Sequence, residues 1–359
     1  MKELRVAFGD RASRAGAWLS LPIVVALVAA PAWGGLDDLR LLSELYAYVA
    51  LASLWNLLAG FAGLVSVGQQ AYVGLGAYLL FALTILGGVP PLLAIPIAGV
   101  LSAALAIPAA ALLFRLRGHY FAIGTWIVAE VFQLLAAQMS VLGGGSGLSL
   151  PVGIVTSIAP TRQWREFLIY WVALALVLCV LVLIVLLLRS RYGLALKAIR
   201  DNEGAARASG IDVTRIKLAV YLIAAFATGM LGALIFLQKL RIKPDAAFSV
   251  NDWTAFVIFM TVIGGIGRIE GPIVGAIVFF LLRQTLSDLG SIYLLLLGAV
   301  AILTMLAAPK GLWGLFVEAT GWQLFPLERR VIRSDDRGQT TDPTPSLRGP
   351  NGSARSAAR

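Results

Sequence analysis

Long apolar runs separated by short polar stretches dominate the chain between residues 17 and 308. A helix needs about 20 apolar residues to cross a bilayer, and fewer where it is broken inside a protein-lined cavity. The pattern therefore predicts an all-α fold, a polytopic transmembrane helical bundle with about ten spans that include short or broken helices. The spans are expected near residues 17–33, 42–60, 66–88, 91–114, 119–138, 167–188, 218–238, 252–266, 271–287 and 290–308.

The two ends of the chain differ from this transmembrane domain of residues 17–308. Residues 1–16 are polar and basic, and we expect them to form a cytoplasmic segment. Residues 309–359 are rich in Ser, Thr, Pro, Gly and Arg, which predicts a cytoplasmic and largely disordered tail. The first apolar run and the small-residue sequence at 30–32 also resemble a signal peptide with a cleavage site, so removal of this run stays an alternative.

The distribution of cations predicts how the bundle is oriented. Counting spans places residues 1–16, the connection at 115–118 and the charged segment 189–217 on one side, which their Lys and Arg residues make cytoplasmic. Asp37 and Asp38 fall on the opposite side. Three cations disagree with the rule, because the same count puts them on the outer face: Lys239, Arg241 and Lys243.

Composition excludes several classes of protein. The chain is 59% hydrophobic and 13% charged, with a mean hydropathy of +0.86, whereas soluble domains carry about 25% charge. The net charge of +10 lies in short segments between apolar runs, so we expect a lipid bilayer as the partner of this surface and no nucleic acid. The single Cys179 and single His119 offer neither a disulfide nor a metal-ligand set, and no cofactor or catalytic residue is expected.

The most informative polar feature is the segment 189–217, the only long charged stretch between two strong spans. Its centre predicts one helix of about 15 residues that ends at Gly210. Asp212 or Thr214 is then expected to cap the next span. Such a helix could dock another protein, and a plain solvated loop fits the spacing equally well.

Polar residues inside the apolar runs suggest a pathway for a solute. The stretch 59–77 combines five glycines with polar side chains, which is typical of backbone that lines a cavity, although glycines also allow close helix packing. An ionisable group near the middle of a span, such as Glu130, must face protein or water. We expect Glu130 to be an electrostatic element of the pathway or of a contact with another membrane subunit, or to form a buried hydrogen bond to a neighbouring helix. Glu44 receives the same interpretation with less weight. The candidate pathway residues are Asn56, Ser66, Gln69, Gln70 and Glu130.

Six stretches of the chain carry a resemblance to a known family. They are NLLAGFAGLVSVGQQAYVGLGAY at 56–78, RLRGHYFAIGTWIVAEVF at 115–132, GGGSGL at 143–148, SRYGLALKAIRDNEGAARASGIDVTRIKLAVYLIAAFATGMLGAL at 190–234, VIGGIGRIEGPIVGA at 262–276 and APKGLWGL at 308–315. In order and spacing they resemble the branched-chain amino-acid permeases of the LivM type, and the resemblance covers roughly residues 40–316. Within the charged segment, Glu203, Ala205, Ala206 and Gly210 resemble the Glu-Ala-Ala…Gly signature of importer permeases, with Gly204 interposed and the closing Leu-Pro absent.

This resemblance implies a multi-pass permease subunit, not an enzyme, of an ATP-driven ABC importer in the bacterial inner membrane. It implies a LivH-type sister permease, two cytoplasmic ATPases and a periplasmic solute-binding protein as partners. The P-loop pattern GxxxxGK[ST] is missing from the sequence, so ATP would be bound by the partner subunits. The residues expected to couple to the ATPases are Arg200, Glu203, Ala205, Ala206, Arg207 and Gly210.

The transported solute is left open by the sequence. Branched-chain amino acids or a similar small solute fit the resemblance, and permeases for urea or short amides form an alternative within the same family. An ion-coupled secondary transporter is a further alternative, which would need paired acids or a charged relay inside the membrane.

Overall fold

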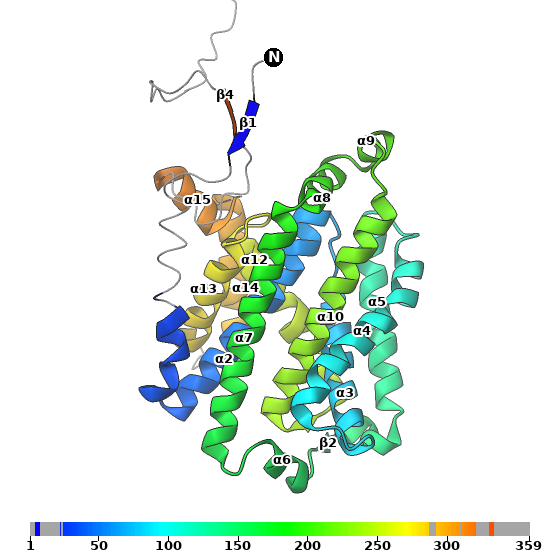
Figure 1. The fold of residues 1–359 in the computed structure, drawn as a ribbon, viewed down its shortest axis with the longest axis vertical. Helices are drawn as coiled ribbons and strands as arrows, with labels where there is room; N and C mark the ends of the chain where they lie inside the picture. The colour runs from blue at the N-terminus through cyan, green and yellow to red at the C-terminus, as the bar shows by residue number, and fades with distance from the viewer. Residues whose placement is uncertain are drawn as a thin grey trace, which may run out of the picture.

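The structure is a computed structural model and describes residues 4–7, 22, 24–286, 292–308, 310–320 and 330–333. Helices make up nearly all of it (Figure 1). They are α2 (Leu36–Asn56), α3 (Gln69–Ile85), α4 (Pro91–Leu113), α5 (His119–Ala137), α6 (Val152–Ile158), α7 (Arg162–Arg189), α8 (Arg191–Asp201), α9 (Glu203–Ala208), α10 (Val213–Lys239), α11 (Pro244–Ala247), α12 (Phe256–Gly264), α13 (Gly271–Leu286), α14 (Ile292–Ala307) and α15 (Gly311–Thr320).

The multi-pass helical bundle predicted from hydrophobicity is confirmed. Within the described residues, seven helical stretches are long and apolar enough to cross a membrane. Two shorter apolar helices, α3 and α13, coincide with further predicted spans. Of the span expected at 17–33, residues 17–21 and 23 lie outside the described residues, and residues 24–28 are helical. The seven long stretches are Leu36–Phe61, Pro91–Leu113, His119–Ala137, Arg162–Arg189, Val213–Lys239, Pro244–Gly264 and Leu295–Thr320.

Helices α3 and α10 touch at the level of their backbones in the centre of the bundle. A Cβ atom on Gly76 would lie 1.9 Å from the carbonyl oxygen of Gly229. One turn along α10, a Cβ atom on Gly232 would lie 2.1 Å from the carbonyl oxygen of Val73. Of the two interpretations of glycine in the stretch 59–77, close helix packing therefore applies to Gly76.

The polypeptide breaks between α2 and α3. After α2 the chain makes a π-helical turn at Leu57–Phe61, and Gly63 then adopts a φ of +69°, which favours glycine. The chain stays non-helical until α3 begins at Gln69. The Trp55 indole N–H donates to the carbonyl oxygen of Ser66 at 2.7 Å, so a side chain replaces one of the lost helical hydrogen bonds. The predicted broken section thus lies between the two helices.

The span expected at 252–266 is also irregular. It begins earlier than hydrophobicity indicated, with the short helix α11, and continues through a π-helical turn at Asn251–Ala255 into α12. α12 ends where Gly265 and Gly267 take positive φ angles of 123° and 78°. The connection at 265–270 then leads directly into α13.

The two ends of the bundle are distinct (Figure 1). Helices α8 and α9 lie at one end, together with α15 and the antiparallel strands β1 (Leu4–Ala7) and β4 (Arg330–Arg333). Helix α6 and the strands β2 (Leu148–Ser149) and β3 (Arg241–Ile242) lie at the other. Helix α15 occupies part of the segment that composition had suggested to be largely disordered.

The cations that disagreed with the orientation rule do lie at the end opposite α8 and α9, because β3 pairs there with β2. The Lys239 ammonium lies over the rings of Trp253 (4.8 Å) and Phe236 (5.2 Å). Lys243 lies 3.6 Å from a carboxylate oxygen of Asp245. Aromatic faces and an acid therefore offset two of these charges locally.

Some charged side chains within the helices are paired where two helices meet. The Arg283 guanidinium on α13 donates to Glu44 on α2 at 2.8 Å. Glu166 on α7 is 3% exposed, and it accepts a 2.7 Å hydrogen bond from Arg40 with Arg165 3.7 Å away. These pairs avoid the cost of leaving a lone charge at membrane depth, roughly 3 kcal/mol or more.

We predict that Gly76→Ala lowers the apparent melting temperature of the detergent-purified protein. The added methyl group collides with the backbone of Gly229, and overpacking typically costs about 1–3 kcal/mol. The matched control is Gly298→Ala on α14, where a Cβ atom meets nothing within 4 Å. Equal melting temperatures for Gly76→Ala and Gly298→Ala would contradict the backbone contact.

Candidate functional site: the coupling segment and its cavity

The coupling segment, residues 190–212, joins α7 to α10 as two short helices. Asn202 ends α8 and begins α9, because its side-chain oxygen accepts a 3.0 Å hydrogen bond from the Ala205 N–H. Gly210 follows α9 with a φ of +81°, as expected of a terminating glycine. Asp212 accepts a 3.0 Å hydrogen bond from the first turn of α10 and caps it. The prediction of one continuous helix is wrong, whereas both predicted end signals are confirmed.

Apolar contacts hold the coupling segment against α10. Ile199, Ala206 and Val213 are at most 3% exposed and form a small core of their own. Leu196 is fully buried in the main core. Ala206, a predicted coupling residue, therefore points inward, while its neighbour Ala205 is exposed. The segment is packed as part of the bundle.

Arg200 links the coupling segment to the break between α2 and α3. Its Nη1 donates to the carbonyl oxygen of Gly60 at 3.0 Å. Its Nε and Nη2 both donate to Asp201 Oδ1 at 3.1 Å. Arg200 thus links α8 to the end of α2 within the subunit, although part of its side chain is exposed.

Glu203 links α9 to α10. Lys217 Nζ donates to its Oε2 at 2.8 Å, and Arg207 Nη2 donates to its Oε1 at 3.0 Å. The hydrogen bond from Lys217, followed by the positive charges of Lys217 and Arg207, lowers the pKa of Glu203 despite partial burial. Glu203 is therefore a carboxylate at neutral pH and a fixed negative partner for two cations.

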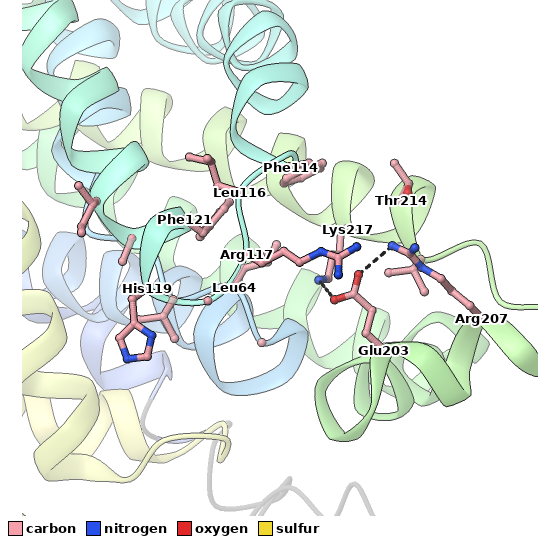
Figure 2. A pocket seen from close by; sticks show the side chains of 16 residues that line it. Leu64, Phe114, Leu116, Arg117, His119, Phe121, Glu203, Arg207, Thr214 and Lys217 are labelled. Carbon is pink, nitrogen blue, oxygen red and sulfur yellow. Dashed lines mark hydrogen bonds and ion pairs between the residues drawn. The ribbon is translucent and has the colours of Figure 1, made fainter.

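A cavity of about 700 Å³ opens beside these ion pairs (Figure 2). Its walls are the chain at 63–65, the α4–α5 connection, α9 and the start of α10. Figure 2 shows Glu203 between Arg207 and Lys217, with Arg117 extending toward them from the α4–α5 connection. Three cations thus face one acid across an otherwise largely apolar space. The labelled apolar side chains are Leu64, Phe114, Leu116 and Phe121.

The coupling segment also has an exposed side, opposite the residues that pack against the bundle. Among the predicted coupling residues, Arg200, Ala205, Arg207 and Gly210 are exposed, and Glu203 is partly exposed. Arg200 and Glu203 also form hydrogen bonds within the subunit. Two large side chains on α8, Tyr192 and Leu194, are 50% and 48% exposed, and the sequence interpretation had not selected them as contacts.

The predicted pathway residue Asn56 holds a connection between helices. It is 1% exposed. Its Nδ2 donates to the Arg268 carbonyl oxygen at 2.7 Å, and its Oδ1 accepts from the Gly267 N–H at 2.8 Å. The side chain of Asn56 therefore binds the α12–α13 connection to the end of α2.

The two glutamines at the start of α3 are likewise buried. Gln69 donates to the Leu51 carbonyl oxygen at 3.0 Å, and the side-chain oxygen of Gln70 accepts from the Thr254 hydroxyl. Gln69 Oε1 and Gln70 Nε2 have no hydrogen-bond partner among the described residues. Ser66 is 5% exposed. Ser66 and Gln69 line one side of a small cavity, and residues 221–228 of α10 line the other.

Glu130 is the one predicted pathway residue near the surface. It lies near the middle of α5, is half-buried, and accepts a 2.9 Å hydrogen bond from the Trp126 indole on its own helix. The described structure thus separates Glu130 from the four other candidates, which lie inside the subunit. In the same described residues, no group of His, Cys, Asp and Glu is arranged to hold a metal ion.

Comparison with known proteins agrees with this architecture. The sequence pattern of the family described as "Branched-chain amino acid transport system / permease component" matches residues 39–308. The chain belongs to this permease family. The match runs from the first turn of α2 to the end of α14, and the predicted resemblance is confirmed.

Individual relatives give the same result. The permease is 30% identical to the high-affinity branched-chain amino acid transport system permease protein LivM of Salmonella typhimurium, over 81% of this chain and 74% of the relative. LivM of Escherichia coli matches equally well. The ribose import permease protein RbsC of Bacillus subtilis is 35% identical over 36% of this chain and 42% of its own length. No solved structure matches the permease.

Sequence reasoning missed several residues that organise the site in this permease. Lys217 had been counted only as a loop cation, yet its ammonium is the shortest contact of Glu203. Arg117 had been used only for orientation, although it lines the cavity. Asn202 carries a signal that could have been found, because Asn is a preferred N-cap residue and directly precedes Glu203.

We predict that Lys217→Met increases hydrogen–deuterium exchange of the α9 amides about threefold at neutral pH, since a partly exposed ion pair contributes on the order of 0.5–1 kcal/mol. Arg215→Met is the matched control, because the Arg215 side chain is 88% exposed and lies on the same helix. An unchanged exchange rate in Lys217→Met would contradict the proposed link between α9 and α10.

The effect should depend on pH in a defined direction. The folded-state pKa of Glu203 is lower than its ordinary value of 4.5, so the ion pair stabilises α9 fully above that pH. This stabilisation is lost as the pH falls through the folded pKa. We therefore expect the difference in exchange between wild type and Lys217→Met, compared at equal pH, to vanish in acid.

Proposed function

We propose that this permease is the membrane-spanning subunit of an ATP-driven ABC importer and provides part of the pathway for a small solute. The observation that carries the proposal is the coupling segment, which is packed onto α10, is bonded to the α2–α3 break through Arg200, and exposes Tyr192, Leu194 and Ala205. A docked ATPase could move the bundle through such a segment. Membership of the permease family supports the same function.

The contacts suggest how motion would travel. A push on α8 acts on α7 and α10, which flank the coupling segment in the chain. It also acts on the break between α2 and α3 through the bond from Arg200 to Gly60. Alternating access would then follow from rocking of these helices, with no covalent step in this subunit.

The remaining partners follow from the same proposal. We place the permease in the bacterial inner membrane, with α8 and α9 in the cytoplasm and the β2–β3 pair on the outer side. A LivH-type sister permease would complete the pathway, two cytoplasmic ATPases would bind and hydrolyse ATP, and a periplasmic solute-binding protein would deliver the solute. The cationic N-terminal segment and the cations of the coupling segment support this orientation.

A branched-chain amino acid or a similar small solute is the cargo that we favour. LivM of Salmonella typhimurium and LivM of Escherichia coli are aligned over 81% of this chain, whereas the ribose import permeases are aligned over less than half of it. Urea and short amides remain the alternative cargo within the family.

An ion-coupled secondary transporter is the competing mechanism. It would require paired acids or a proton relay within the membrane. Glu44 is instead paired with Arg283 at 2.8 Å, and Glu130 lies on a different helix with only an indole as partner. This arrangement favours the ATP-driven mechanism.

We predict that proteoliposomes containing this chain, the sister permease, both ATPases and the binding protein take up labelled leucine only when ATP is supplied on the ATPase side. Uptake should continue in the presence of a protonophore, because no ion gradient drives it. Uptake by this chain alone, driven by a proton gradient, would overturn the proposed function.

We also predict that Arg200→Gln lowers solute-stimulated ATP hydrolysis by the complex about tenfold or more, since a hydrogen bond from a charged donor is worth about 1.5–3 kcal/mol. Arg191→Gln is the matched control, because Arg191 is an exposed cation of the same helix whose guanidinium lies over the Tyr192 ring at 5.7 Å. Equal stimulation in the two variants would show that the Arg200–Gly60 bond transmits nothing.

A further inference from the structure

Helix α5 exposes most of one face at an edge of the bundle (Figure 1). The α5 stripe, as we name this face, follows one side of the helix at intervals of three and four residues. The four hydrophobic side chains of the α5 stripe are between 46% and 64% exposed. The α5 stripe consists of Ile123, Trp126, Ile127, Glu130 and Leu134.

Other spans also expose broad faces, and these faces differ chemically from the α5 stripe. Helix α4 contains no ionisable residue along its whole length. Helix α7 has no Asp, Glu, Lys or Arg between Phe167 and Leu188, and its exposed side chains there include Trp171, Val182 and Leu186. Such faces suit contact with lipid chains. The α5 stripe carries a carboxyl group near its middle, where lipid is a poor solvent for it.

Glu130 differs from Glu44 in the partners that the described residues offer. Glu44, an acid within α2, is paired with Arg283 at 2.8 Å. Glu130 has a hydrogen bond from the Trp126 indole and no ion pair among the described residues. An indole donor satisfies one of the lone pairs of a carboxyl group and supplies no counter-charge. A group from outside the subunit would complete the site.

The α5 stripe also continues into the functional site. Ile123, at its cytoplasmic end, lines the 700 Å³ cavity beside Glu203 and Lys217. Toward the opposite end of α5, Gln133 donates to Asp245 on α11 at 3.3 Å. Polar groups therefore accompany this edge of the bundle along the length of α5, which a lipid-facing surface would not need.

We propose that the α5 stripe is the contact surface for the second permease subunit, and that this subunit places a cation or a hydrogen-bond donor opposite Glu130. The proposal rests on the proposed function, which requires two membrane subunits. Charge complementarity identifies the occupant, because a membrane helix with a Lys, Arg, amide or hydroxyl side chain can supply what Glu130 lacks. The pathway would then run beside α5, between the two subunits.

Photo-crosslinking in membranes that contain the complete transporter tests this surface. Ile127→Cys and Leu134→Cys are introduced separately in a Cys179→Ser background and labelled with benzophenone maleimide. We expect an adduct between this chain and the sister permease from both positions. The matched controls are the native Cys179, which is exposed on α7, and Leu186→Cys on the same helix, which should give no such adduct.

Three results would overturn the proposal. The first is an adduct with the sister permease from α7 and none from α5. The second is an adduct from α5 with another copy of this chain only, and the third is no protein adduct from α5. If ATP-dependent uptake persists in any of these cases, the α5 stripe is refuted as the contact surface, and the proposed function is not. An α5 adduct in a complex whose uptake needs no ATP would instead refute the proposed function.

Substitutions of Glu130 test the charge. The amount of sister permease recovered with affinity-tagged chain should fall about tenfold or more in Glu130→Leu, since a hydrogen bond to a charged group contributes about that factor. Glu130→Gln should retain more of it, because an amide can still accept a hydrogen bond. The amount of this chain in the membrane serves as the folding control. Full recovery of the sister permease with Glu130→Leu would overturn the role of Glu130.

Discussion

Backbone groups freed by the break between α2 and α3 must find partners inside the protein, because lipid offers none. An unpaired peptide group in hydrocarbon costs several kcal/mol, of the order of 4–8 kcal/mol in an alkane reference. Trp55 donates to the Ser66 carbonyl oxygen, Gln69 donates to that of Leu51, and Thr254 donates to Gln70. These contacts fix the irregular chain between α2 and the π-helical turn before α12. Gln69 and Gln70, which the sequence suggests for the solute pathway, therefore form hydrogen bonds that stabilise the chain around the break.

The same break connects the coupling segment to the bundle. Its first carbonyl groups include that of Gly60, which accepts the hydrogen bond from Arg200. One turn earlier, the side-chain amide of Asn56 donates to the Arg268 carbonyl oxygen and accepts from the Gly267 N–H, so it holds the α12–α13 connection. Movement of α8 thus reaches α2, α3 and the α12–α13 connection through hydrogen bonds, in addition to α7 and α10 through the chain. Since α3 and α10 touch backbone to backbone at Gly76 and Gly229, little of this movement can be absorbed by side chains between them.

Hydrophobic runs predict the existence of the spans because length and apolarity alone determine whether a helix suits a bilayer. They do not predict which way a span faces, since almost every side of these helices is apolar. For this reason Gln69, Gln70 and Glu130 were all candidates in sequence, although the fold buries the glutamines and leaves Glu130 on α5 near the surface. The division of the coupling segment at Asn202 was missed for a different reason. Alanine-rich flanks favour a continuous helix, and the preference of Asn for a cap competes with it over a single residue.

Glu44 and Glu130 show what a single chain of a membrane complex can reveal about a missing neighbour. Both are acids within apolar helices, although Glu44 lies nearer the end of its span. Folding brings Arg283 to Glu44, so that site is complete within the subunit. Among the described residues, folding brings only the Trp126 indole of the same helix to Glu130. Because an acid at membrane depth needs a partner, a described acid without a counter-charge is the reason to propose that another protein covers this face of the subunit.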